Sequence, residues 1–143
     1  MARRWRRRID TGPATWTVAD LSVPGAALVV RFDSRFRHDP VARSANPIRV
    51  GIALPFNERF GPFDRRQLDK TEDEVERVAA GRGVMVLILT TPEMREHVLY
   101  TATGDWIPQF HQDLKRALRK YDVQMMAEED PDWSVYMEFT RVS

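Results

Sequence analysis

The side chains of this 143-residue sequence that could support catalysis or metal binding are few and scattered. Its histidines are His38, His97 and His111, and no pair has the i, i+4 or short-loop spacing of a metal site. The absence of cysteine excludes disulfides, thiolate nucleophiles and cysteine-ligated zinc or iron–sulfur sites. No Gly-rich phosphate-binding turn and no Gly-x-Ser-x-Gly elbow occurs. We therefore expect no metal, no cofactor and no catalytic residue that the sequence alone identifies.

Four carboxylates cluster near the C-terminal end, namely Glu128, Glu129, Asp130 and Asp132. Such a cluster could hold a divalent cation or supply an acid and a base. However, Asp130 precedes a proline, which is the pattern of a helix N-cap followed by proline at the first helical position. Asp132 would favour the positive end of the same helix dipole. The pattern therefore favours a structural role.

A second set of candidates begins on one predicted strand. Arg95 and His97 occupy odd positions and share a face, whereas Tyr100 points away. A small-molecule, hydrolase-like enzyme would need a carboxylate, Glu128 or Asp130, close to His97. Aromatic residues at helical spacing are more often core than ligand cage. The possible binding surface is made of Arg95, His97, Tyr100, Asp130, Trp133 and Tyr136.

The N-terminal segment is rich in arginine. Residues 1–13 combine like charges with Gly and Pro and no periodicity, which predicts a flexible arm before a single domain over 14–143. The five arginines of this segment contribute a charge of +5. Because the whole chain has a net charge of +1, residues 9–143 sum to −4. With Trp5 among them, the five arginines could bind nucleic acid by charge and stacking, or form a solvated tail. These arginines are Arg3, Arg4, Arg6, Arg7 and Arg8.

Alternating and helical periodicities predict the elements that must position these residues. Residues 33–47 are expected to form a polar loop, and Gly81 to close the first helix. The expected strands are residues 15–20, 26–32, 48–56, 84–90, 96–103 and 123–127. The expected helices begin after Asp64, at Asp105 and at Asp130, the last with Trp133, Tyr136 and Phe139 facing inward.

The order of these elements predicts the fold class. From residue 48 onward the order is βαββαβ and then α, which indicates two helices on one face of a mainly antiparallel sheet. The prediction is an α+β, ferredoxin-like core with an N-terminal strand pair and a C-terminal helix. A ββα unit used twice fits the same order.

Composition limits the location and partners of the protein. The hydrophobic fraction of 43% and charged fraction of 30% are those of a globular protein. The longest apolar run, Val84 to Leu89, is far shorter than the ~20 residues of a membrane span. We expect no membrane span and, without cysteine, a cytoplasmic location. An exposed edge strand would permit a homodimer.

Several segments, among them Leu87–Tyr100, Asp105-Trp106 and Glu129–Trp133, occur in an order that is similar to a known family. With them, residues 14–140 resemble the bacterial domain of unknown function 695 family. The resemblance implies a shared fold but no activity, cofactor or catalytic residue. The motif of acidic residues, Pro, Trp and Tyr is also similar to that of the bacterial regulators of ribonuclease E activity, type B, which are ferredoxin-like and act by binding the enzyme. The residues that carry the family resemblance are Leu87–Tyr100 (LILTTPEMREHVLY), Asp105-Trp106, Phe110, Tyr121-Asp122-Val123, Glu129–Trp133 and Tyr136, with Gly61-Pro62, Leu68, Glu72-Asp73 and the strand at 48–55.

These observations lead to two hypotheses of different classes. The favoured one is a non-enzymatic regulatory module that binds another protein, because the sequence holds no nucleophile, metal or phosphate motif. The alternatives are a small-molecule enzyme and an RNA-binding protein that uses the Arg-rich arm.

Overall fold

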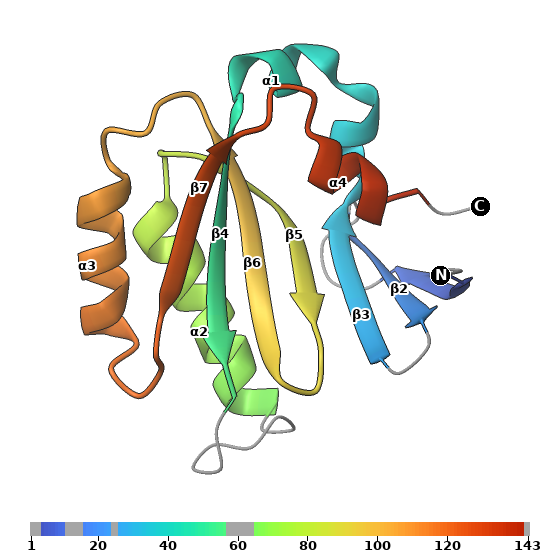
Figure 1. The fold of residues 1–143 in the computed structure, drawn as a ribbon, viewed down its shortest axis with the longest axis horizontal. Coiled ribbons are helices and arrows are strands. Elements are labelled where there is room, and N and C mark those ends of the chain that lie inside the picture. The colour runs from blue at the N-terminus through green and yellow to red at the C-terminus, as the bar shows by residue number, and fades with distance from the viewer. Residues whose placement is uncertain (1–3, 11–15, 24–25, 57–64, 142–143) are drawn as a thin grey trace.

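The computed structural model describes residues 4–10, 16–23, 26–56 and 65–141, which form an antiparallel sheet with helices packed against it (Figure 1). The strands are β1 (Arg4–Asp10), β2 (Trp16–Val23), β3 (Ala26–Asp33), β4 (Ile48–Pro55), β5 (Val84–Thr90), β6 (Met94–Thr101) and β7 (Gln124–Glu129). The helices are η1 (Ser34–His38, 3₁₀), α1 (Pro40–Ala45), α2 (Arg65–Ala79), α3 (Ile107–Ala117) and α4 (Ser134–Phe139).

The strand order confirms the ferredoxin-like core. The order is β1-β2-β3-β5-β6-β4-β7, and each neighbouring pair is antiparallel. Within it, β4, β5, β6 and β7 are the four strands of the βαββαβ unit, and β2 and β3 form the predicted N-terminal hairpin. The alternative of a repeated ββα unit is wrong, because β5 and β6 separate β3 from β4.

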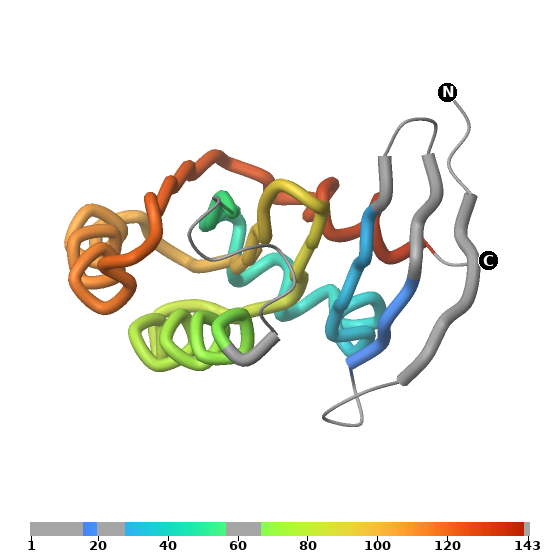
Figure 2. The backbone as a smooth tube through the Cα atoms, turned by 90° about the horizontal axis from the view of Figure 1, so that it is seen from below, coloured from blue at the N-terminus to red at the C-terminus, as the bar shows by residue number. Residues whose placement is uncertain are grey.

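Two hydrophobic cores lie on the two sides of this sheet. The helix-side core packs one face of β4 and β6 against α2 and α3, which lie side by side (Figure 2). Its fully buried members include Val50, Ile52 and Leu54, so the predicted alternation of β4 is the physical basis of this core. The aromatic core lies on the other side, where Trp133 and Tyr136 pack over residues of β3, β5 and β6.

Several sequence predictions need correction. Arg4–Asp10 form strand β1, paired with β2, where an arm without regular structure was expected. The expected loop at 33–47 contains η1 and α1. Asp33 accepts a hydrogen bond from the Arg35 N–H, and Asp39 accepts one from the Ala42 N–H. Both aspartates are helix N-caps. The helices that follow them were not predicted because they show no hydrophobic periodicity.

The helix ends also differ from expectation in part. Gly81, with φ +78°, follows α2 as predicted, whereas Asp64 of the expected capping box lies outside the described residues. Trp106, and not Asp105, is the N-cap of α3, and no side chain caps that helix. The last helix begins at Ser134 after Trp133, whose φ of +54° places it in the left-handed region.

Among the described residues, no helix combines the length and apolar character that a membrane span requires.

Candidate functional site

The sheet face turned away from α2 and α3 is the candidate site, and we call it the open face. Strand alternation and the pairing registers place on it Arg49, Gly51, Ala53, Glu96, Gln124, Met126 and Glu128. These residues come from the edge strand β7 and from β4 and β6, the two strands next to it in the sheet. Gln124, Met126 and Glu128 are exposed, and 45% of the Met126 surface is accessible.

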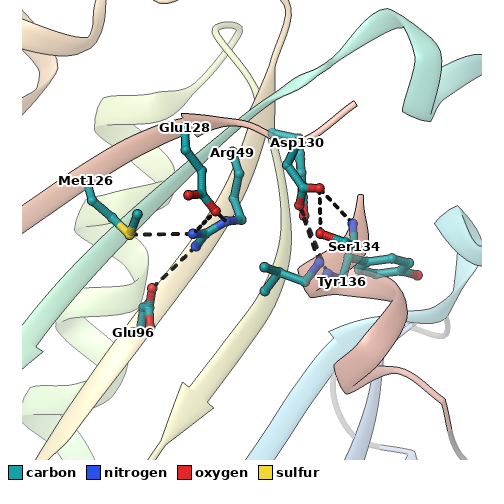
Figure 3. Close-up of polar contacts among 9 residues, drawn as sticks. Arg49, Glu96, Met126, Glu128, Asp130, Ser134 and Tyr136 are labelled. Atoms are coloured by element: carbon teal, nitrogen blue, oxygen red, sulfur yellow. Dashed lines mark hydrogen bonds and ion pairs between the residues drawn. The ribbon is translucent and has the colours of Figure 1, made fainter. Parts of the chain in front are cut away.

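Arg49 organises the polar part of the open face (Figure 3). Its Nε donates to Glu128 Oε1 at 3.1 Å, and its second amino group forms an ion pair with the same oxygen. Glu96 Oε2 lies 3.9 Å from Arg49 on the other side, and the Met126 sulfur is 3.5 Å from the guanidinium. The side chain of Arg49 is only 9% exposed, whereas that of Glu128 is 48% exposed. One buried cation is therefore shared by two carboxylates, which leaves this part of the face with an excess of negative charge.

Gly51 forms the floor between these side chains. A Cβ built at this position would lie 2.5 Å from Glu96 Oε2 and 3.3 Å from Met126 Cγ. Any larger residue at this position would displace the Glu96 carboxylate from its place beside Arg49. Burial raises the pKa of Glu96, and the positive charge of Arg49 opposes that effect.

Asp130 ties the end of β7 to α4 and to the sheet. One carboxylate oxygen accepts the Tyr100 hydroxyl at 2.7 Å, and the other accepts the Ser134 N–H at 2.8 Å and the Ser134 hydroxyl at 2.7 Å. Burial by itself would raise the pKa of Asp130, but the hydrogen bonds from Ser134, Tyr100 and Val135 outweigh it and hold the pKa below its usual value. Burial raises the pKa of Tyr100, and the hydrogen bond to Asp130 raises it further.

The predicted aromatic residues lie next to Asp130 and are buried. Trp133 stacks on Tyr100 with ring centroids 4.1 Å apart, and Tyr136 meets the edge of Trp133 at 5.5 Å. The Trp133 Nε1–H donates to the Asn46 carbonyl at 2.8 Å. The structure thus brings Tyr100, Asp130, Trp133 and Tyr136 together, but as core beneath the surface, with none more than 6% exposed. This confirms the prediction that these rings serve packing.

Arg95 and His97 lie on the opposite, helix-covered face, as strand alternation predicts. Arg95 Nε donates to the Thr90 hydroxyl at 3.0 Å. His97 is fully buried, and neither ring nitrogen has a hydrogen-bond partner among the described residues. Burial, and then the positive charges of Arg95 and Arg31, lower the pKa of His97 to about 3. The part of the chain that the structure describes therefore offers His97 no carboxylate for acid–base catalysis.

The remaining candidates lie elsewhere. Arg4, Arg6, Arg7 and Arg8 belong to β1, at the opposite edge of the sheet from β7, and Arg3 lies outside the described residues. No group of three or more potential metal ligands occurs among the described residues, the acidic cluster included. Two surface hollows lie between α2 and α3, and neither is lined by an open-face residue.

Sequence reasoning did not single out Arg49, Gly51, Glu96 or Met126. The signal was present for two of them, because the alternation of β4 places Arg49 and Gly51 on the face opposite its apolar residues. Their contacts with Glu96 and Glu128 depend on strand order, which the sequence leaves open.

Comparison with known proteins finds one family. No curated protein and no solved structure matches the chain, so the similarity to regulators of ribonuclease E activity is not shown. The model of a family described as "Family of unknown function (DUF695)" matches residues 14–140, which include the open face, α4 and both cores. The chain therefore belongs to the DUF695 family of unknown function.

Proposed function

We propose that the protein is a non-enzymatic, cytoplasmic module that regulates another protein by binding it through the open face. The observation that carries this proposal is the part of the open face formed by β4 and β7, where exposed Met126 lies beside the Arg49 ion pairs. Exposed methionine is adaptable contact surface, and a buried arginine paired with carboxylates is rigid. The surface thus combines the apolar and charged contacts that protein interfaces use.

The distribution of polar groups supports binding over catalysis. Asp130, Tyr100 and Tyr136 use their polar atoms in contacts that hold α4 on the sheet, and the imidazole of His97 is enclosed in the helix-covered face. A general acid or base must reach a substrate within hydrogen-bond distance. The exposed carboxylate of Glu128 is instead committed to Arg49.

A site-specific photo-crosslinking experiment tests this proposal. A photoreactive amino acid replaces Gln124 or Met126 on the open face, and Lys115 on the exposed surface of α3 serves as the matched control position. In cells that make the protein, we expect one defined protein to be crosslinked from Gln124 and Met126 and not from Lys115. The absence of a defined product, or the same products from all three positions, contradicts the proposal.

RNA binding is a second candidate, favoured by the four arginines that β1 places along an extended edge of the sheet. If each neutralises one phosphate of single-stranded RNA, the binding constant should fall about 50-fold between 50 and 200 mM salt. A fluorescence titration with single-stranded RNA measures this, and replacing Arg4, Arg6, Arg7 and Arg8 by alanine should abolish binding. No binding even at the lower salt concentration rejects this candidate.

A further inference from the structure

The hydrogen bonds of β4 show which backbone groups of β7 face away from the sheet. The Asp130 N–H donates to the Pro47 carbonyl at 2.8 Å, and the Phe56 N–H donates to the Glu93 carbonyl at 2.8 Å. In antiparallel strands, hydrogen-bonded and non-hydrogen-bonded pairs alternate along each ladder. The odd-numbered residues of β4 therefore bond to β7, and the even-numbered ones bond to β6.

It follows that Met125, Ala127 and Glu129 direct their N–H and C=O groups away from β4. Each is paired with an even-numbered residue, in an unbroken register that runs from Ile48↔Glu129 to Ala53↔Gln124. None of the described residues forms a hydrogen bond to the outward N–H and C=O groups of Met125, Ala127 and Glu129. Because β7 ends the strand order, these groups form a free edge.

His111 supplies an independent check of this assignment. Val123 has the same parity as the three outward-facing residues, and its carbonyl accepts a hydrogen bond from His111 Nε2 of α3 at 3.0 Å. A carbonyl that bonds to α3 points away from β4, as the alternation requires. His111 therefore closes the start of the edge, and the free groups begin at Met125.

The two edges of the sheet differ in how they are protected. Natural sheets block exposed edges with lysine, proline, bulges and like charges. At β1 the register shifts between Trp5 and Arg8, and four of its residues are arginines. In contrast, β7 contains no proline and no register shift, and its only charged residues are Glu128 and Glu129, which repel an acidic strand and attract a basic one. The edge at β7 is thus the one left able to pair.

We propose that β7 accepts an extended segment of a partner protein as an added strand, and that this segment carries basic side chains. The inference rests on the proposed protein-binding function and names the chemistry of the partner. Main-chain hydrogen bonds to Met125, Ala127 and Glu129 supply the pairing, and side chains supply the selectivity.

Charge complementarity identifies the occupant. Glu128 and Glu129 are consecutive, so they flank the edge on both faces of the sheet, and both are exposed. Arg49 is shared between Glu128 and Glu96, and Glu129 forms no ion pair with any described residue. A basic residue on either face of the incoming strand meets a carboxylate. A second copy pairing through its own β7 brings no cation, because that strand contains none.

Hydrogen exchange with a defined probe tests the proposal. The probe is a synthetic peptide of about ten residues that alternates lysine with valine, and the control peptide has glutamate in place of lysine. In the free protein, the amides of Met125, Ala127 and Glu129 should exchange rapidly and those of Met126 and Glu128 slowly. The lysine peptide should slow the first group at low salt, and the glutamate peptide should not.

Two variants separate main-chain pairing from charge. Ala127→Pro removes an outward N–H and no bond to β4, whereas its matched control Ala127→Ser keeps that N–H. We expect Ala127→Pro and Glu129→Lys each to weaken lysine-peptide binding at least about tenfold, and Ala127→Ser to bind like the unmodified protein. Circular dichroism verifies that each variant is folded.

The possible failures are distinguishable. Equal binding by Ala127→Pro, or no protection of the three amides, overturns the edge proposal, while the crosslinks from Met126 still decide whether the open face binds a protein. A third outcome is that the protein self-associates, that Ala127→Pro prevents this self-association and that the lysine peptide does not compete with it. This result overturns the choice of partner and assigns the edge to a second copy of the chain.

Discussion

At the residue scale, His97 is the most unusual group in the molecule. It is fully buried on the helix-covered face, between Ile52 and Ile88 of the neighbouring strands, without a hydrogen-bond partner among the described residues. The charged groups near it include Arg95 and Arg31, and Arg31 is paired with Glu72 of α2. A buried imidazole without a carboxylate is stable only when neutral.

This environment predicts a pH-dependent stability. The pKa of His97 is about 3 in the folded protein and about 6.5 when unfolded, so between these values the unfolded chain binds the extra proton. The free energy of unfolding is therefore unaffected by the protonation of His97 above pH 6.5. Below that pH it falls by about 1.4 kcal/mol per pH unit until the folded pKa is reached. Urea unfolding between pH 4 and pH 7 measures this slope.

Two variants show whether the slope belongs to His97. His97→Leu, which cannot be protonated, should remove most of the slope, and His38→Ala, at an exposed position of η1, should leave it intact. An unchanged slope in His97→Leu would mean that other groups cause the dependence. The stability of His97→Leu at pH 5 should equal or exceed that of the unmodified protein, because leucine carries no polar atom to desolvate.

At the element scale, α4 is the part most dependent on specific polar contacts. It has only six residues, too few to be stable alone, and its N-terminal N–H groups are satisfied by Asp130. The tertiary contact Tyr100–Asp130 and the stacked ring of Trp133 hold the helix on the sheet. The left-handed φ of Trp133 is maintained because its ring is locked in this core.

Removing the carboxylate should therefore loosen α4. We expect Asp130→Ala to lower the free energy of unfolding by about 2–3 kcal/mol, because it leaves the Tyr100 hydroxyl and two N–H groups without partners. Tyr100→Phe, which removes the hydrogen bond to Asp130 and the longer one from the Tyr136 N–H, should cost about 1–2 kcal/mol. Chemical denaturation of both single variants and the double variant measures the coupling, and strictly additive effects would show that the Tyr100–Asp130 bond contributes nothing.

The pKa of Asp130 also makes the stability of the protein depend on pH. Because folding lowers its pKa, its stabilisation is present above the pKa of the unfolded carboxyl and is lost as the pH falls through the folded value. In Asp130→Ala this acid-range loss should disappear from the stability curve.

At the scale of the whole molecule, one sheet supports two cores. Val75 of α2 belongs to the helix-side core and Val30 of β3 to the aromatic core, and both are fully buried. Because β5 pairs with β3 on one side and with β6 on the other, the two regions share one hydrogen-bonded sheet, and we expect the domain to unfold as one unit.

A matched pair of substitutions tests this cooperativity. Val75→Ala and Val30→Ala should each lower the free energy of unfolding by about 2 kcal/mol, from lost apolar burial and the cavity left behind. Val41→Ala, at a residue that is 77% exposed, should change it by less than about 0.5 kcal/mol. Tryptophan fluorescence and far-ultraviolet circular dichroism should report coincident transitions in all three, and separate midpoints would show two independent units.

The sequence by itself determined the elements with strong periodicity and their order. The alternation of Ile48 to Phe56 predicts β4, the apolar run from Val84 predicts β5, and the βαββαβ order predicts the fold class, because burial of one face imposes period 2 on strands and 3.6 on helices. It also indicated that the rings of Trp133 and Tyr136 are core. The short helices η1 and α1 escaped prediction because, unlike the segment that forms α4, they carry no series of large apolar residues at helical spacing.

Only the tertiary structure decided which of these residues form a surface. Arg49 meets Glu128 across 79 positions of sequence, and Tyr136 reaches the Asp33 carbonyl across 103, through pairings that local patterns do not encode. The outward direction of the Ala127 N–H depends on the β4–β7 register, which is set when two distant strands align their apolar faces. The physical reason is that the pattern of apolar residues within a segment determines whether it forms a helix or a strand, whereas the contacts across the sheet depend on which distant strand pairs with it and in which register.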